Sequence, residues 1–299
     1  MKIDQPILTI NKLSKSDIKT KFKSWNNRTK AETSINIIKD EITKLYSGLF
    51  FHSVKFNQGA TFFRARKEEG ERFDKKSELW VPNKRYVTKY GRANRPNDPV
   101  FYLGKDGRTA LFESQLSTGD LVEVAEIQVK DGEKLACMHI GMYERFHDIQ
   151  EHVFNAMKDS LMKGGLTDRG WNNLKYLDKL MCAEFLKDVN SNKTDDYIVS
   201  ALVAEYLLSY DKVDALIYPS KKSPNDCNVV VKPSSAQKKL KMTAVRRLRI
   251  TNSTLDDFEI QYLDAASVDH DNENLNWLES KVLPPFEWPT FKNGMMKKV

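Results

Sequence analysis

Strand-like segments in this chain follow one another without the regular alternation with helices that a parallel sheet requires. The loops GxGxxG and GxxxxGKS/T, which bind phosphates in dinucleotide-binding and P-loop folds, do not occur. Both observations disfavour a doubly wound fold. They predict an α+β domain with a bent or split, mostly antiparallel sheet core and surrounding helices. The expected strands, recognised by apolar or alternating residues between turn signals, are Thr61–Arg66, Val100–Leu103, Leu121–Val129, Ala215–Ser220, Cys227–Val231, Ala244–Thr251 and Phe258–Leu263.

The front of the chain has a helical period instead, with apolar residues at helical spacing between Ile35 and Leu45. The composition then changes near Gly48. We therefore expect an N-terminal helical extension over residues 1–50, a main domain over residues 51–265 and a C-terminal tail over residues 266–299. Further helices are expected at Thr109–Leu116, Ile149–Met162, Asn172–Leu186 and Tyr197–Tyr210.

Several classes of protein are disfavoured by what the sequence lacks. No stretch approaches the roughly 18 apolar residues that a membrane span needs, and the first residues lack the apolar core of a secretory signal. Cys137, Cys182 and Cys227 are far apart, which is typical of reduced thiols rather than of a disulfide or metal framework. The five histidines include no HExxH pair. We expect a cytoplasmic protein without a metal site or membrane contact.

The net charge of +7 raises the question of a nucleic-acid partner. Short basic clusters occur at Lys238–Lys241, Arg246–Arg249 and Lys297–Lys298. A solvated face explains most of this charge, so nucleic-acid binding is the weaker interpretation. The positive charge also suits an anionic ligand or an acidic protein partner, and charge alone does not distinguish among these interpretations.

Three separated regions of the sequence resemble one family in their order and spacing. The first is Phe63–Arg66. The second is Gly91–Asn94, which leads into Pro99–Leu103 and Thr109–Glu113. The third is Asp214–Ser220 together with Asn228. These regions resemble the RES domain, a family named for its arginine, glutamate and serine, over about residues 55 to 235.

Two positions depart from the family pattern. Ala93 stands where the family usually has tryptophan, and Asn97–Asp98 replaces a frequent glycine. Both changes lie in one loop at the rim of the expected pocket, so they affect substrate recognition more than the fold.

The resemblance implies a fold similar to the ADP-ribosyltransferase toxins and an activity that consumes NAD⁺. Here NAD⁺ is the substrate, and no true cofactor is implied. Some members of the family hydrolyse or phosphorolyse NAD⁺, and others transfer ADP-ribose to a protein. RES toxins are usually neutralised by a cognate antitoxin, so such a partner is expected, while a homo-oligomer stays open.

The chemistry of NAD⁺ cleavage gives reasons for these residue types. Breaking the nicotinamide–ribose bond develops positive charge on the sugar, which a fixed carboxylate, Glu113, would stabilise. The planar guanidinium of Arg64 would bind the pyrophosphate, with Arg92 as an aid, and Arg66 is the main competitor for this role. Tyr102 would stack on nicotinamide.

Two polar residues complete the expected site. Ser220 would offer its hydroxyl to the ribose or the carboxamide, and Asn228 is a further substrate-binding candidate. A serine hydrolase is disfavoured because Ser220 lacks the glycines of a nucleophile elbow.

Each candidate also has a structural interpretation. The arginines can be surface residues of a strand or loop, Tyr102 can be core, Glu113 can be the exposed residue of an amphipathic helix, and Ser220 and Asn228 can be turn residues. Three functions therefore stay open: NAD⁺ degradation by a growth-arresting toxin, ADP-ribosyl transfer to a specific macromolecule, and non-catalytic binding through a basic face.

Overall fold

The structure is a computed structural model that describes residues 9–28, 31–46, 54–145, 151–189, 193–222, 226–254, 257–269 and 272–278. The chain forms two compact units, each assembled from segments that are distant in sequence. The first contains residues 1–54, 87–98 and 138–219, and the second contains residues 55–86, 99–137 and 220–299. These units do not test the expected division into three consecutive parts, which stays a prediction.

The first unit begins with the predicted N-terminal helical segment, formed by α1 (Thr9–Lys12), α2 (Lys15–Asn27) and α3 (Glu32–Tyr46). A capping box starts α2: Ser14 Oγ accepts a hydrogen bond from Asp17 N at 3.1 Å, and Asp17 Oδ2 accepts one from Ser14 N at 2.7 Å. Backbone N–H groups at the helix start are thereby satisfied.

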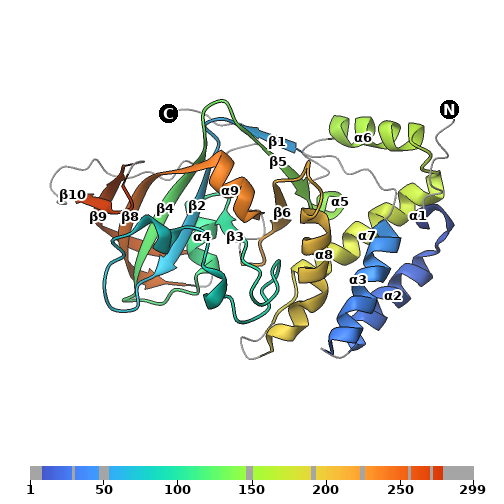
Figure 1. Ribbon diagram of the computed structural model, residues 1–299, viewed down its shortest axis with the longest axis horizontal. Coiled ribbons are helices and arrows are strands. Elements are labelled where there is room, and N and C mark those ends of the chain that lie inside the picture. Colours follow the sequence, from blue (N-terminus) through green and yellow to red (C-terminus); the bar gives the residue numbers. More distant parts are fainter. Residues whose placement is uncertain are drawn as a thin grey trace. The chain divides into compact units, whose positions relative to one another are not determined.

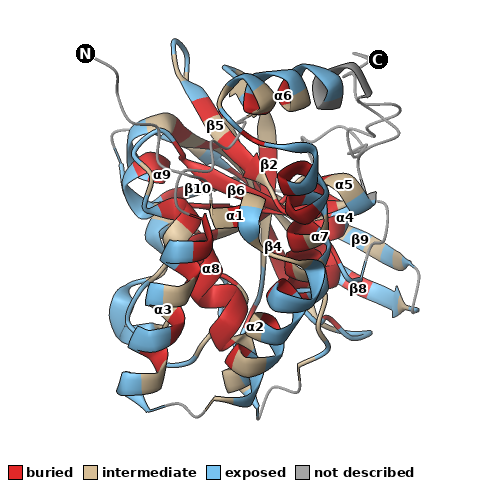
Figure 2. Cartoon of the chain, turned by 90° about the vertical axis from the view of Figure 1, so that its right-hand side faces the viewer, coloured by how far each residue is buried: buried red, intermediate tan, exposed pale blue. Residues whose placement is uncertain are grey.

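The core of the first unit surrounds α8 (Ile198–Leu208), which is apolar on nearly all sides. It packs against α3, α7 (Asp168–Phe185) and the buried strand β6 (Ala215–Pro219). Figure 1 shows α2, α3, α7 and α8 of this unit, and Figure 2 shows how much of α8 is buried. A helix that is hydrophobic all round requires this burial. The unit also contains α5 (Met142–Arg145) and α6 (Glu151–Lys163).

The second unit is built on antiparallel strands in the order β7-β3-β2-β4-β8-β9-β10. Their bounds are β2 (Thr61–Lys67), β3 (Phe101–Gly104), β4 (Leu121–Val129), β7 (Cys227–Val231), β8 (Leu240–Ser253), β9 (Phe258–Val268) and β10 (Leu275–Leu278). Two other strands, β1 (Val54–Asn57) and β5 (Lys134–His139), cross the boundaries between the units along the chain. The prediction of an α+β protein with a mostly antiparallel sheet is confirmed.

The sheet is split between β2 and β3. β2 pairs with β4 along its whole length, from Thr61 opposite Gln128 to Lys67 opposite Val122, but it pairs with β3 only through Phe63 opposite Gly104. Beyond that pair the strands separate, and their facing backbone groups need other partners.

Helix α4 (Gly107–Glu113) covers one face of the sheet beside this split. Phe63 and its neighbours on β4 and β8 pack with α4 in one apolar cluster. Helix α9 (Pro233–Lys239), which precedes β8, contributes no residue to this cluster. The cluster consists of Phe63, Ala110, Leu111, Leu116, Val122, Val124, Leu248 and Ile250. It fixes the helix that carries Glu113.

Candidate functional site

The position of α4 depends on a cap and on a glycine. Asp106 caps the helix, because its Oδ1 accepts a hydrogen bond from Thr109 N at 2.7 Å. Gly104, at the end of β3, faces the helix so closely that a Cβ there would lie 2.6 Å from Ala110 N and 2.8 Å from Asp106 O. Both contacts are with backbone, so only glycine fits this approach. Neither Asp106 nor Gly104 was predicted from the sequence to be a site residue.

Glu113, the last residue of α4, is held by two buried donors. Ser220 Oγ donates to Glu113 Oε1 at 2.8 Å, and Asn228 Nδ2 donates to the same oxygen at 2.7 Å. Ser220 is 1% exposed and Asn228 is 5% exposed, whereas Glu113 itself is exposed. Within the part of the chain that the structure describes, Glu113 Oε2 makes no hydrogen bond. One carboxylate oxygen is therefore fixed, and the carboxylate remains accessible.

The backbone places the two donors beside β3. Asn228 pairs with Gly104 in the β3–β7 ladder, and Lys105 N donates to Cys227 O at 3.1 Å. Ser220 N donates to Asp226 O at 3.0 Å, which brings Ser220 to the start of β7. The structure thus brings Glu113, Ser220 and Asn228 together from three separate segments.

Arg64 and Ser114 satisfy backbone groups in the split of the sheet. Continuing the β2–β3 register would place Tyr102 opposite Ala65, but the strands have separated there. Arg64 Nη1 donates to Tyr102 O at 3.3 Å, and Ser114 Oγ lies 3.1 Å from Ala65 O and 2.8 Å from Ala110 O. Side chains thus replace the missing ladder bonds. Ser114 was not identified from the sequence, because its partner is a carbonyl of a distant strand.

Part of the Arg64 side chain makes structural contacts. Its guanidinium lies 5.5 Å from the centroid of the Phe101 ring, and its buried Nε has no hydrogen-bond partner among the described residues. Burial, together with the nearby Arg66, lowers the pKa of Arg64 to about 10. The side chain still carries its charge at neutral pH.

The neighbouring Arg66 makes different contacts. Its Nη1 donates to Glu78 O at 2.7 Å, and its guanidinium lies 4.5 Å from the centroid of the Phe73 ring.

Tyr102 lies two residues before Gly104 on β3, so the two residues share a face of the strand. This is the face that α4 covers. The roles expected for these residues toward a substrate stay predictions.

Arg92 belongs to the first unit and contacts the end of α7. Its guanidinium donates to Phe185 O, to Lys187 O at 3.3 Å and to the hydroxyl of Tyr197 at 3.4 Å. It also lies 5.0 Å from the centroid of the Tyr197 ring. A cation at the C-terminus of a helix satisfies its last carbonyls. These contacts are structural, and the substrate-binding role expected for Arg92 stays a prediction.

In the two basic clusters that fall on described residues, Lys241, Arg246 and Arg247 form ion pairs. Arg246 Nη1 lies 3.1 Å from Glu126 Oε2, and Arg247 makes a bidentate pair with the buried Glu68 at 2.7 and 2.9 Å. Lys241 Nζ lies 3.1 Å from Asp131 Oδ2. The third cluster, Lys297–Lys298, lies outside the described residues. Part of the positive charge of the described clusters is therefore neutralised by carboxylates within the protein.

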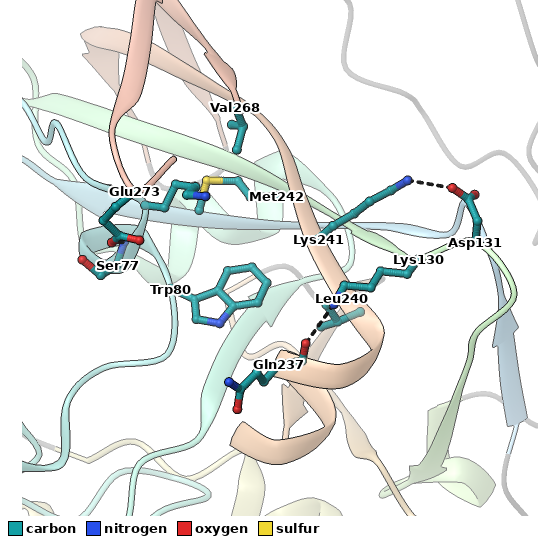
Figure 3. Close-up of a pocket in the computed structure, with 11 residues that line it drawn as sticks. Ser77, Trp80, Lys130, Asp131, Gln237, Leu240, Lys241, Met242, Val268 and Glu273 are labelled. Atoms are coloured by element: carbon teal, nitrogen blue, oxygen red, sulfur yellow. Dashed lines mark hydrogen bonds and ion pairs between the residues drawn. The ribbon is translucent and has the colours of Figure 1, made fainter. Parts of the chain in front are cut away.

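A cavity of about 760 Å³ in the second unit does not include the Glu113 group (Figure 3). Trp80, Leu240 and Met242 give it an apolar wall, and it also has charged side chains such as Glu273 and Lys241. Lys241 points toward Asp131 in this view. Volume alone would favour this cavity as a ligand site, but it has no carboxylate fixed by buried donors. The Glu113 group is the better candidate for chemistry.

Cys137, Cys182 and Cys227 are buried and form no disulfide within the described residues. In the described ranges no three histidine, cysteine, aspartate or glutamate side chains are grouped as metal ligands. None of the described helices has the length and apolar character to cross a membrane.

Comparison with known proteins identifies the family. The model of the RES domain matches residues 61–252, which is more than half of the chain and includes all seven of the expected site residues. No curated protein and no solved structure matches the chain. Members of the matched family are generally enzymes that act on NAD⁺. The chain belongs to the RES-domain family.

Proposed function

We propose that this protein degrades NAD⁺ by cleaving the bond between nicotinamide and ribose. One observation carries the proposal: Glu113 is an accessible carboxylate with one oxygen fixed by the buried donors Ser220 and Asn228. A carboxylate held in this way needs no reorganisation when positive charge develops beside it, which makes it an effective electrostatic catalyst.

The proposed reaction needs a cation stabiliser and an acceptor. The carbon–nitrogen bond breaks, its electron pair leaves with nicotinamide, and the ribose becomes oxocarbenium-like. Glu113 stabilises this charge, and an acceptor oxygen then bonds to the same carbon. With water the products are ADP-ribose and a proton, and with phosphate the product is a phosphate ester of ADP-ribose. The identity of this acceptor distinguishes a glycohydrolase from a phosphorylase.

The other expected residues take binding roles in this proposal. Arg64 binds the pyrophosphate, because its guanidinium is charged and its one hydrogen bond within the described residues uses a single Nη1 donor. Arg66 and Arg92 are secondary candidates, and Tyr102 stacks on nicotinamide. Ser220 and Asn228 orient Glu113, in addition to the substrate contacts expected of them.

The proposed biological role is that of a toxin in a toxin–antitoxin pair, acting in the cytoplasm. Family membership supports this role, and the positive net charge suits an acidic antitoxin. Expression without a partner should slow growth and deplete cellular NAD⁺. Harmless overexpression of active enzyme, with cellular NAD⁺ unchanged, would count against it.

Two other functions are outcomes of the same test. ADP-ribosyl transfer to a protein would use the same bond cleavage with a side-chain acceptor. A non-catalytic basic binding protein is less well supported, because Arg246, Arg247 and Lys241 are already ion-paired.

Incubation of the purified full chain with NAD⁺ tests the proposal, followed by mass spectrometry of the products. Parallel reactions contain buffer alone, phosphate, or a cell extract as a source of protein acceptors. Nicotinamide with ADP-ribose indicates hydrolysis, and its phosphate ester indicates phosphorolysis. ADP-ribose attached to a protein only in the extract indicates the transferase. Absence of nicotinamide in all three reactions contradicts the proposal.

A further inference from the structure

The cavity of about 760 Å³ in the second unit has the features of a ligand site of its own (Figure 3). Its described lining residues come from the 3-10 helix Lys76–Leu79 and the residue after it, from the end of β4, from α9 and from the starts or ends of β8 and β9. None of them belongs to α4, β3 or β7, the elements around Glu113. Ligand pockets are typically about 300 to 1,000 Å³, so the cavity is large enough for a molecule the size of a nucleotide.

Trp80 gives the cavity an aromatic platform. Its ring centroid lies 4.8 Å from that of the fully buried Phe101, so the platform rests on the core of the sheet. Its main-chain N–H donates to Ser77 O at 3.4 Å, which ends the 3-10 helix. The indole N–H makes no hydrogen bond among the described residues. The half-buried ring is therefore fixed by packing, and the part that lines the cavity can stack on another ring.

The carboxylates that line the described part of the cavity already have partners. Glu273 Oε1 accepts a hydrogen bond from Ser77 N at 2.8 Å, and Asp131 Oδ2 lies 3.1 Å from Lys241 Nζ. Three lysines and two carboxylates contribute to the lining, so its charge is net positive. This balance favours an anionic ligand over a cationic one.

Two of the lysines are held by main-chain carbonyls. Lys130 Nζ donates to Gln237 O at 2.9 Å and to Lys238 O at 3.2 Å, and Lys76 Nζ donates to Asp269 O at 2.9 Å. A carbonyl accepts a hydrogen bond without neutralising the ammonium, and Lys130 forms no ion pair within the described ranges. Both lysines are half-buried, which makes their attraction for an anion stronger than at a fully exposed position.

We propose that this cavity is a second binding site, and that its ligand is a nucleoside diphosphate. The base stacks on Trp80, and the phosphates bind the ammonium groups of Lys130 and Lys76. The side-chain amide of Gln237 offers both a donor and an acceptor to the edge of the base. An apolar ligand would leave the lysines without an anion, and inorganic phosphate would leave Trp80 without a stacking partner. The site goes beyond the proposed function, because it uses none of the Glu113 group.

Titration of the full chain with ADP, followed by calorimetry, tests the proposal. Stacking tolerates any base, so ADP is a suitable probe. Arg64→Ala is the background, since it removes the expected pyrophosphate ligand of the NAD⁺ site and should leave ADP binding at the cavity intact. In this background Trp80→Leu should weaken ADP binding by about fivefold to a hundredfold, and Trp80→Phe should recover most of the loss.

Lys130→Gln tests the site without changing the platform. The glutamine still donates to the carbonyls at the end of α9, but it removes the charge, so ADP binding should weaken by about threefold to tenfold. This variant decides the question if Trp80→Leu fails to fold. Tyr86→Ala is the control, because Tyr86 is 68% exposed and does not line the cavity. It should bind ADP like its parent.

The parts of the ligand provide a second test. Adenosine and inorganic pyrophosphate should each bind more weakly than ADP, because each engages only one half of the site. Pyrophosphate that binds as tightly as ADP would overturn the nucleotide as the ligand. Unchanged ADP affinity in both Trp80→Leu and Lys130→Gln would overturn the site. So would a concentration-dependent dimer that Trp80→Leu abolishes without any ADP binding, since the cavity would then hold a second copy of the chain.

The titration needs no turnover, so it separates this inference from the proposed function. ADP binding that depends on Trp80, in a protein that releases no nicotinamide, would leave the second site standing and the proposed function without support. Nicotinamide release by the wild type, with ADP binding that is lost in Arg64→Ala and kept in Trp80→Leu, would place ADP at the NAD⁺ site. That result would overturn the second site alone.

Discussion

Ser220 donates its hydroxyl hydrogen to Glu113 across 2.8 Å, although 107 positions of sequence separate the two residues. The same carboxylate oxygen accepts a hydrogen bond from Asn228. Both donors are buried, so water cannot easily take the place of either donor when a substitution removes it. The orientation of Glu113 should therefore depend on both.

Removal of either donor should lower the rate of nicotinamide release. Ser220→Ala and Asn228→Ala should each reduce kcat by about tenfold to a hundredfold, as expected for a hydrogen bond to a charged group. The double variant should lose less than the product of the two, because both donors orient one oxygen. Steady-state kinetics measure this, with the exposed Ser234→Ala as control. Wild-type kcat in both single variants would remove the donors from the account.

Arg64→Ala should weaken NAD⁺ binding more than the chemical step, because the pyrophosphate is bound in both the ground state and the transition state. Arg64→Lys should recover little, since an ammonium cannot replace the planar fork. Both variants also lose the contact with Tyr102 O, so urea unfolding should show a loss of about 0.5–1.5 kcal/mol. A large rise in KM for Arg66→Ala with none for Arg64→Ala would assign the pyrophosphate to Arg66 instead.

Gly104→Ala should destabilise the protein and reduce activity together. The new methyl group would meet backbone atoms of α4, so the helix has to shift, at a cost of about 1–3 kcal/mol. A displacement of Glu113 by an ångström would cost on the order of a hundredfold in rate. Gly59→Ala is the control, because Gly59 has a φ of +83° but nothing within 4 Å of an added Cβ. That variant should lose stability through backbone strain and keep kcat. Equal activity of the two variants would show that Gly104 does not position the site.

A buried carboxyl elsewhere in the second unit should make stability depend on pH. Glu123 is fully buried: its Oε1 accepts from Phe73 N at 2.8 Å, and its Oε2 has no partner among the described residues. Burial, together with the nearby Glu68, raises the pKa of Glu123 from 4.5 to about 8. Between these values the folded protein keeps a proton that the unfolded chain has released. Its contribution to stability is therefore full below pH 4.5 and falls until about pH 8.

Glu123→Gln keeps the acceptor for Phe73 N and removes the ionisation. We expect this variant to be more stable than the wild type by about 1–3 kcal/mol at pH 8, with a smaller difference at low pH. Urea unfolding at several pH values measures the effect. A difference that is the same at every pH would show that Glu123 does not titrate in this range.

The strands of the second unit could be predicted because their apolar residues alternate or cluster between turn signals. The ends of the strands were predicted less accurately: β8 begins at Leu240 rather than Ala244, and β9 extends to Val268 rather than Leu263. Leu240 and Met242 are buried and alternate with Lys241 and Thr243, so this part of β8 carries a strand signal that the prediction missed. β5 and β10 were not predicted at all, since a strand as short as Leu275–Leu278 is defined by its pairing with β9.

The candidate site was predictable only where a side chain carries the chemistry. Glu113, Ser220 and Asn228 were recognised by their resemblance to the family, and the structure brings them together. Gly104, Asp106 and Ser114 act through backbone contacts with distant segments, which no local pattern of residues reveals. For the same reason the partners of Arg92, which are main-chain carbonyls at the end of α7, could not be foreseen.

The most direct test of the account is the rate at which Glu113→Gln releases nicotinamide from NAD⁺. The substitution keeps the shape of the side chain and an oxygen for Ser220 and Asn228 but removes the negative charge. We expect the rate to fall on the order of a hundredfold to a thousandfold, with folding intact and much of the NAD⁺ affinity retained. The exposed Glu259→Gln is the matched control and should match the wild type. A wild-type rate in Glu113→Gln would contradict the central claim that this carboxylate stabilises the reacting ribose.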